Sequence, residues 1–380
     1  MPLRFVYTVQ CERKGGEIRH HKQRYTKKEG KGMKKHVSYM VILVIGALLT
    51  WSAVTTAGEI TVYTALDTDD VKVYVDKFHQ QIPNVKVNIY RVSAGKLGAK
   101  IRAEAQNPHH DVIWGWTISE MERPDILPMI EPYRPKGIEK INSKFLDPSG
   151  NWFATTGYFG ALCINTDMLK ANNLPMPSSW LDLADPVYKG HVVMPSPLDS
   201  GTGYLQVAAF VQTMGEEKAW KYLKELDNNI AQYTSSGSKP CKLARDKEYS
   251  IGITYAFAAV KIINKFIESG VDVPIKLVIP SEGAGYELEV TALMKASQNK
   301  EDSKKFLDWL LSDTAINLYN ELAAMNCITG TSQSKRAQQA NLPTDVSKVF
   351  AGVDLKKSAR DKAMITGKWK KEIFDKRPIR

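Results

Sequence analysis

The sequence predicts an α/β protein with two α/β lobes and a ligand cleft between them. Strand-like and helix-like segments alternate twice along the chain, first over residues 59–115 and again over residues 191–255. This alternation is typical of βαβ units on a parallel sheet. No low-complexity linker separates the two blocks, so we expect strands that cross between the lobes. A cleft between α/β lobes is a common place for a small ligand.

The first block opens with a β-branched strand over residues 59–64. Helical periodicity follows over 69–81, where Val71, Tyr74, Val75 and Phe78 share one face, and Pro83 ends it. The remaining expected elements are a strand over 85–90, a helix from about 95 to 106 and a strand over 111–114 that ends at Gly115.

The second block begins after a proline-rich stretch and a buried strand over 158–165. Its expected strands cover 191–194, 230–233, 250–255, 275–280 and 287–294, and its expected helices cover 203–214, 216–226 and 239–246. One helix is expected over 301–324, and polar, Lys-rich helical pieces are expected after Gly330. We therefore assign 58–157 to the first part of lobe 1, 158–286 to lobe 2, and 287–380 to a return to lobe 1 with C-terminal helices.

The charge of the chain is concentrated at its N-terminal end. The formal net charge is +11, but residues 1–57 hold 11 basic and 3 acidic side chains, which leaves +3 for the other 323 residues. A nearly neutral body argues against a nucleic-acid partner, because such binders carry a basic stripe through the folded domain.

Residues 33–57 are predicted to be a secretory signal peptide. Lys34 and Lys35 precede an apolar run over 37–54, and small residues follow as far as Ala57. The apolar run is at the lower limit of membrane-spanning length, so an uncleaved anchor is the alternative. Residues 1–32 are interpreted as a non-native or unstructured extension before the true start; the alternative is a cytoplasmic tail on an anchor. Cleavage near Ala57 predicts a periplasmic protein.

Three cysteines follow the predicted cleavage site, Cys163, Cys241 and Cys327. An oxidising compartment is compatible with one disulfide, and the sequence leaves three pairings open. A bridge between Cys163 and Cys241 would lie within one lobe, whereas Cys327 follows the helices that return to the other. The alternative is three buried free thiols, since cysteine is often a small buried hydrophobe.

Signatures of enzymes and of metal or cofactor sites are missing from the sequence. It contains no GxSxG, HExxH or P-loop motif, and Gln206 stands where a dinucleotide fingerprint would need its third glycine. His109 and His110 are adjacent and so lack metal-ligand spacing, which favours an ordinary turn. We expect no catalytic residue, no metal and no cofactor.

Small hydroxyl residues and glycines occur in three loops between an expected strand and helix. Such loops offer free backbone N–H groups at the positive end of a helix dipole, which suit phosphate, phosphonate, sulfate or carboxylate. Any one loop could be an ordinary helix cap, but three loops from both blocks favour anion binding. The candidate residues are Ser93, Gly95 and Lys96; Ser200, Gly201, Thr202 and Gly203; and Ser235, Ser236, Gly237 and Ser238.

Aromatic and acidic residues form a second set of candidates. Gly115 and Trp116 follow an expected strand, where cleft residues lie in α/β sheets, and Tyr255 ends another strand. Trp116 is the best candidate for a ligand wall, with core packing as the alternative. Glu287 or Glu289 could pair with a ligand amine or hydroxyl, although solvated surface carboxylates are commoner.

Several segments resemble bacterial extracellular solute-binding proteins of ABC importers, namely 59–64, 107–115, 178–190 with 193–195, 200–203 and 233–242. The resemblance covers about 59–324, and the stretch YTSSGSKPCK at 233–242 is most similar to the 2-aminoethylphosphonate-binding branch. It implies a type II periplasmic-binding-protein fold with the ligand between the lobes. Thr64 and Ala65, at the end of the first strand, join the candidate ligand-binding residues.

Hexose-phosphate and ferric-iron binders are near relatives of that branch. Iron binders often carry an adjacent tyrosine pair, whereas here Tyr255 is followed by Ala256 and Phe257. This difference favours an anionic solute and leaves ferric iron as the alternative ligand. The resemblance implies a monomeric receptor that captures a small anionic solute and delivers it to an ABC permease and its ATPase at the inner membrane. A secreted phosphatase would need a nucleophile with a positioned base or clustered metal ligands, and neither is visible. An adhesive or signalling surface protein would not need anion loops from both lobes.

Overall fold

The computed structural model describes residues 58–377 except 324 and 332. The predicted signal peptide and the N-terminal extension lie outside these residues. Within the described part, none of the helices combines the length and the apolar character needed to span a membrane.

The first section of the sheet is built from the N-terminal strands, as expected. Strand β1 pairs in parallel with both β2 and β3, and helices connect the three. Helix α2 buries Val71, Tyr74 and Phe78 on one face, which is the apolar stripe that the sequence predicts. The elements of this section are β1 (Gly58–Thr64), α2 (Thr68–Gln81), β2 (Val85–Arg91), α3 (Ala94–Ala103), β3 (Val112–Thr117) and α4 (Ile118–Met121).

Strand β3 continues beyond the end that the sequence predicts. Gly115 and Trp116 lie inside β3, where Gly115 has φ +64° and the pairing with β10 shifts register between Val290 and Ala292. A β-bulge with glycine in the left-handed conformation therefore carries the strand on. The expectation that Gly115 and Trp116 follow the strand is wrong for this reason.

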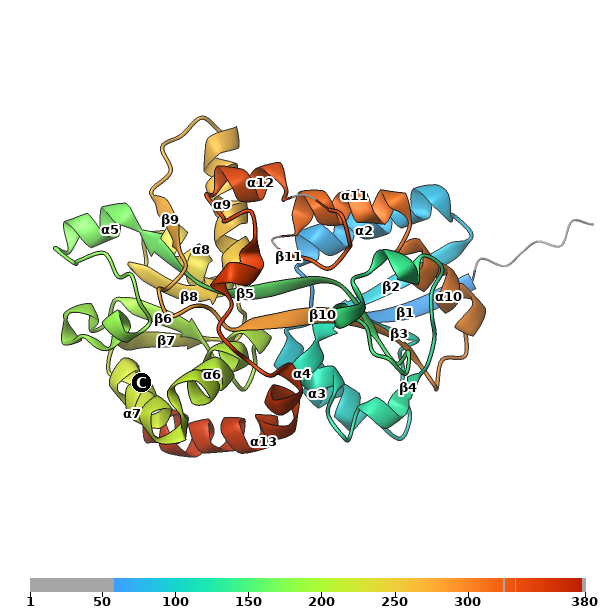
Figure 1. The fold of residues 1–380 in the computed structure, drawn as a ribbon, viewed down its shortest axis with the longest axis horizontal. Coiled ribbons are helices and arrows are strands. Elements are labelled where there is room, and N and C mark those ends of the chain that lie inside the picture. Colours follow the sequence, from blue (N-terminus) through green and yellow to red (C-terminus); the bar gives the residue numbers. More distant parts are fainter. Residues whose placement is uncertain (1–57, 324, 332, 378–380) are drawn as a thin grey trace, which may run out of the picture. The chain divides into compact units, whose positions relative to one another are not determined.

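Two long strands cross from the first section of the sheet to the second. Strand β10 (Tyr286–Met294) pairs antiparallel with β3 and with the first half of β5 (Phe153–Asn165). The second half of β5 pairs with β8 and β9. Figure 1 shows β5 and β10 running between the two groups of helices. The crossing strands that the sequence predicts are therefore present.

The second section of the sheet contains β8, β6 and β7 in parallel, next to β5. Its helices lie on both faces, with α6 and α7 on one and α8 and α9 on the other (Figure 1). The elements are α5 (Thr166–Ala171), β6 (Val192–Pro195), α6 (Gly201–Met214), α7 (Glu216–Asp227), β7 (Ile230–Thr234), α8 (Lys239–Arg245), β8 (Ile251–Tyr255), α9 (Ala256–Glu268) and β9 (Ile275–Val278). Short strands β4 (Ile130–Glu131) and β11 (Met325–Asn326) pair with β10 and β5.

Two helical predictions differ from the structure. Helix α9 is not predicted, although Lys261, Asn264, Lys265 and Glu268 recur at helical spacing and leave an apolar stripe on the other face. The single helix expected over 301–324 is two helices, α10 (Lys300–Trp309) and α11 (Asp313–Leu322). Ser312 separates them, since its side chain accepts a hydrogen bond from the Ala315 N–H and caps a new helix.

The C-terminal segment does not pack as one body on the first section. Helices α10 and α11 contact elements of the first section, whereas α12 (Lys335–Gln339) contacts α9, and α13 (Leu355–Glu372) contacts both α4 and α6. Ile365 and Trp369 of α13 belong to the hydrophobic cluster that also contains Trp220 and Ile230. The tail therefore reaches both sections.

Cys163 on β5 and Cys241 on α8 form a disulfide bond, with Cα atoms 5.2 Å apart. Cys327 is a buried free thiol. Asn165 Nδ2 also donates to the Ala244 carbonyl at 2.7 Å, so two links join β5 to α8. This is one of the three pairings that the sequence leaves open.

Candidate ligand-binding cavity

A cavity of about 100 Å³ lies where the two sections of the sheet meet. The N-terminal ends of α3 and α6, the loop before α8 and the crossing strands β5 and β10 surround it. One water needs about 10–15 Å³ by this measure, so the cavity has room for a small solute. Ten predicted residues line it: Ala65, Ser93, Gly115, Ser200, Gly201, Thr202, Ser236, Gly237, Ser238 and Tyr255.

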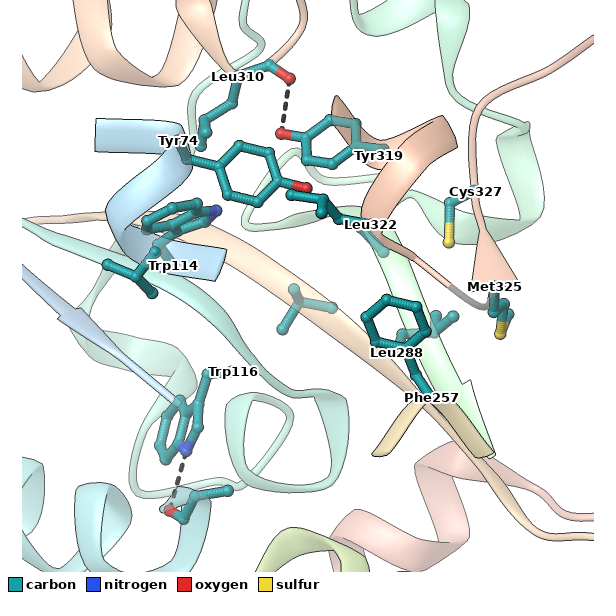
Figure 2. Packing of buried hydrophobic residues seen from close by; sticks show 14 of the residues in the cluster. Tyr74, Trp114, Trp116, Phe257, Leu288, Leu310, Tyr319, Leu322, Met325 and Cys327 are labelled. Atoms are coloured by element: carbon teal, nitrogen blue, oxygen red, sulfur yellow. Dashed lines mark hydrogen bonds between the residues drawn. The ribbon is translucent and has the colours of Figure 1, made fainter. Parts of the chain in front are cut away.

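Trp116 does not line this cavity. Its side chain is fully buried, and its indole N–H donates to the Ala94 carbonyl at 3.0 Å. Figure 2 shows it apart from Trp114, which does reach the cavity wall. Trp116 supports the backbone at the start of α3 instead of forming the ligand wall that its sequence position suggests.

The other predicted residues outside the cavity have structural partners or face solvent. The Thr64 hydroxyl accepts from the Leu66 N–H, and Gly203 packs against the backbone of Pro195 and Ser196. Lys96 and Ser235 are exposed. Seven of the predicted residues thus lie outside: Thr64, Gly95, Lys96, Trp116, Gly203, Ser235 and Glu287.

The three predicted loops touch one another across the cavity mouth. The Ser93 hydroxyl donates to the Ser235 carbonyl at 2.9 Å, and the Gly95 N–H donates to the Asp199 carbonyl at 3.2 Å. A Cβ atom on Gly237 would lie only 2.2 Å from Thr202 Oγ1, so glycine is needed for this close approach. The loops from both sections therefore meet in a closed arrangement.

One end of the cavity is rich in hydrogen-bond donors. Gly201 and Thr202 open α6, so their backbone N–H groups have no acceptor within the helix. The Ser236 and Ser238 hydroxyls lie 3.4 Å apart beside them. Donors and the positive end of a helix dipole favour an anionic group at this end.

Charged side chains surround this donor-rich end. Arg91 donates to the Leu66 carbonyl and pairs with Asp67 at 3.4 Å, while Asp67 also accepts from the Tyr255 hydroxyl at 2.6 Å and from Lys261 at 3.0 Å. Burial raises the pKa of Asp67, but Lys261, Tyr255 and Arg91 together hold this pKa below its usual value. Asp67 is therefore a carboxylate whose charge is already satisfied by the protein.

Glu289 also lines the cavity. Its Oε2 atom accepts from the Thr156 hydroxyl at 2.5 Å, and the aromatic side chains of Tyr74, Trp114 and Tyr319 line the same cavity. These three rings lie together in Figure 2. Burial, with the nearby charges of Asp67 and Asp70, raises the pKa of Glu289 to about 7. An acceptor with little charge compensation thus faces the cavity.

Glu287 lies two residues before Glu289 but has a different environment. It is fully buried outside the cavity and accepts from the Ser119 N–H at 3.3 Å. Burial raises the pKa of Glu287 to about 7. Of the two carboxylates considered from the sequence, Glu289 is the one that a bound solute could reach.

Several cavity residues were missed by the sequence analysis. Asp67 and Arg91 follow or end the first two strands, so a search at the carboxyl ends of all strands would have found them. Tyr158 lies in the middle of β5, where a long buried run gives no sign of a cavity. Among residues 58–377, apart from 324 and 332, no group of three His, Cys, Asp or Glu side chains is placed to hold a metal ion.

Comparison with known proteins gives consistent matches. Residues 127–338 match the family described as bacterial extracellular solute-binding protein. An uncharacterized protein of Haemophilus influenzae is 31% identical over 351 residues, which cover 89% of this chain and 97% of that protein. The major ferric iron-binding protein of Neisseria meningitidis is 25% identical over 288 residues, covering 74% of this chain and 82% of that protein.

Among solved structures, the periplasmic binding protein AfuA from Actinobacillus pleuropneumoniae, with fructose-6-phosphate bound, is similar to this chain with a TM-score of 0.75. Its sequence identity is 31%, and the match covers 83% of this chain and 99% of AfuA. The periplasmic binding protein P5PA is similar with a TM-score of 0.74 and 28% identity.

Proposed function

Since this chain belongs to the bacterial extracellular solute-binding protein family, we propose that it captures a small anionic solute in the periplasm and delivers it to the permease and ATPase of an ABC importer. The chain has the two-lobed α/β fold of periplasmic binding proteins. It is a solute-binding protein of the ABC importer group and not an enzyme.

The mixed lining of the cavity is the observation that carries the choice of solute. The loops at Ser200–Thr202 and Ser236–Ser238 line it with hydroxyls and with the N–H groups that open α6, and Glu289 lines it with a carboxylate. A solute with an anionic group for these donors and an amine or hydroxyl for Glu289 would satisfy both. 2-Aminoethylphosphonate has this form, and an organophosphate such as a sugar phosphate is the second candidate. The structure of the similar protein AfuA has fructose-6-phosphate bound, which supports the choice of a solute with a phosphate or phosphonate group.

Capture is proposed to proceed by closure of lobe 1, made of 58–157 and part of the chain after 286, onto lobe 2, made of 158–286. Strand β5 is the natural hinge, because it pairs with strands of both sections of the sheet, and β10 runs beside its first half. Only a solute that binds the closed form better than the open form can shift this equilibrium. The cavity contacts both lobes, as such a solute requires.

Binding is tested by thermal denaturation and calorimetry with 2-aminoethylphosphonate, fructose 6-phosphate, inorganic phosphate and ferric citrate. A solute at about 100-fold excess over its Kd stabilises the folded state by roughly 2.7 kcal/mol, which is measurable. We expect a phosphonate or phosphate ester to stabilise the protein. Stabilisation by ferric citrate alone would instead support the iron alternative.

Thr202→Val tests the donor-rich end, because valine keeps the shape of threonine but removes the hydroxyl. Loss of a hydrogen bond to a charged group should weaken binding by about ten-fold or more. Thr213→Val is the matched control: Thr213 lies near the other end of α6, and its hydroxyl donates to the Ala209 carbonyl at 2.7 Å. Equal affinities of T202V and wild type would mean that this loop only caps the helix.

A further inference from the structure

Helix α13 is anchored on the second section of the sheet by apolar contacts and by ion pairs. Ile365, Trp369 and Ile373 belong to the hydrophobic cluster of that section. Lys368 pairs with Glu216 of α7 at 2.7 Å, and Lys224 of α7 pairs with Glu372 at 2.8 Å. Figure 1 shows α13 running along α6 and α7 towards α4. Motion of the second section would therefore carry α13 with it.

One buried side chain of α13 reaches the first section. Lys362 is only 4% exposed, and its ammonium lies 3.0 Å from Glu120 Oε1 and 3.3 Å from the Ser119 hydroxyl, both on α4. Glu120 is itself 2% exposed. A buried lysine without a partner is costly, so this contact fixes where α4 must lie.

The same ammonium also contacts the second section. It lies 4.2 Å from the ring centre of Tyr204 on α6, and the Tyr204 hydroxyl donates to the Ser358 carbonyl of α13. Gln212 of α6 donates to the Ser358 hydroxyl at 2.8 Å. Lys362 is thus held between α4 and α6, which belong to different sections.

The surroundings of this contact connect it to the cavity. Ser119 Oγ lies 3.5 Å from the hydroxyl of Thr117, which lines the cavity, and the Ser119 N–H donates to Glu287 on the crossing strand β10. Arg102 and Arg123 lie 3.4 and 3.9 Å from Glu120, so this carboxylate keeps cationic neighbours from its own section. Separation of α4 from α6 would break the Lys362 contacts and admit water.

We propose that α13 is a strap across the two lobes and that Lys362, held between Glu120 and Tyr204, stabilises the closed arrangement. This inference rests on the proposed function, because it concerns closure over the solute. Lys362 touches no part of the cavity, so it acts as a positioning residue.

Single-molecule energy transfer in the absence of any solute tests the strap. Fluorophores attached through a bioorthogonal amino acid at Lys72 of α2 and Lys221 of α7, both well exposed, report the separation of the two sections and leave the native cysteines intact. Lys362→Met should lower the ratio of short-distance to long-distance molecules by about ten-fold, the size expected for loss of a hydrogen bond to a charged group. Lys370→Met, which removes an exposed ion pair to Asp375 within the C-terminal tail and no contact to either section, should leave the ratio unchanged.

Glu120→Gln is the second variant, because it keeps the shape of the side chain and should shift the ratio in the same direction even where K362M folds poorly. Lys362→Arg should restore part of the closed population. Wild-type ratios in folded K362M and E120Q would overturn the proposal, and so would an equal shift in K370M. The measurement needs no solute. If the protein binds none of the four tested compounds but shows the expected shift, the result supports the strap and contradicts the proposed function.

Discussion

Among single residues, Glu289 has the clearest link between environment and binding. Its carboxyl faces the cavity with one hydrogen bond from Thr156, and burial raises its pKa to about 7. This pKa lies above the ordinary glutamate value of 4.5, so Glu289 carries a proton in a larger share of molecules as the pH falls below 7. A solute ammonium requires the carboxylate form and must displace that proton.

The affinity for 2-aminoethylphosphonate should therefore rise with pH up to about 7 and then level off. Below this pH the affinity should fall by about ten-fold per pH unit, since one unit lowers the charged fraction by that factor. Glu289→Gln is the control for the titration of the solute itself, because it removes the carboxylate and leaves the phosphonate unchanged. The fall in affinity at low pH should be shallower in E289Q than in the wild type. Parallel pH curves for the wild type and E289Q with 2-aminoethylphosphonate would exclude Glu289 as the amine partner.

Cavity residues could be predicted from the sequence where the residue type and its position in the chain point to the same use. The Ser and Gly loops could be predicted because small hydroxyl residues before helices have few other uses than capping and anion binding. Trp116 and Glu287 could not be placed, because a bulge extends β3 past its expected end and because neighbouring carboxylates differ only in their tertiary surroundings. Neither cause is visible in local sequence.

At the level of elements, the alternation of strands and helices was predictable because period 2 and period 3.6 patterns are local. The missed helix α9 and the break between α10 and α11 show where local patterns fail. In α9 the first five residues are all apolar and buried, and the polar residues that mark the helical period, Lys261, Asn264, Lys265 and Glu268, come only after them. At Ser312 a capping side chain outweighs the continuity of the apolar pattern on either side.

The disulfide bond between β5 and α8 should restrain the loop before α8. The Cys163–Cys241 bridge spans 78 residues, and chain-entropy arguments give an unstrained bridge of this size about 4 kcal/mol of stability. Helix α8 begins at Lys239, directly after Ser236–Ser238, so the bridge also restrains the donor-rich end of the cavity. Removing it should lower both stability and affinity.

Chemical denaturation of the C163A/C241A variant should show the loss in the free energy of unfolding, and calorimetry should show weaker binding of 2-aminoethylphosphonate. Cys327→Ala is the matched control, because it removes a buried sulfur atom that takes part in no bridge. Peptide mapping of periplasmic protein without reduction identifies the pair directly. Finding Cys163 and Cys241 both alkylated as free thiols would refute the bridge.

For the molecule as a whole, the two-lobed fold was predictable because alternating blocks without a linker leave few other topologies. The course of the C-terminal tail was not, since α13 is set by contacts with α4 and α6 that lie far away in sequence. Net charge was equally uninformative about the site. A value near zero for residues 58–380 conceals an uneven distribution around the cavity.

A second cavity of about 130 Å³ adjoins the first and shares Asp67, Arg91, Ser236 and Ser238 with it. Lys242, Arg245, Lys261 and Lys265 also line this second cavity, against the acidic side chains of Asp67 and Asp69. Lysines beside a binding site raise the rate at which anions arrive, because opposite charge steers diffusion. The excess of cations should therefore speed the capture of an anionic solute.

Lys242→Glu with Lys265→Glu should slow the association of 2-aminoethylphosphonate several-fold at low salt, with a smaller change in the dissociation rate, as stopped-flow fluorescence can measure. The effect should shrink as salt rises, since exposed charges are screened over about 10 Å at 0.1 M ionic strength. Lys170→Glu with Lys189→Glu is the control, because both lysines are exposed, neither lines either cavity, and the change in net charge is the same. Equal slowing by the two double variants would mean that total charge, and not its position beside the cavity, sets the rate. A slowing confined to the K242E/K265E protein would tie the uneven charge distribution to solute capture.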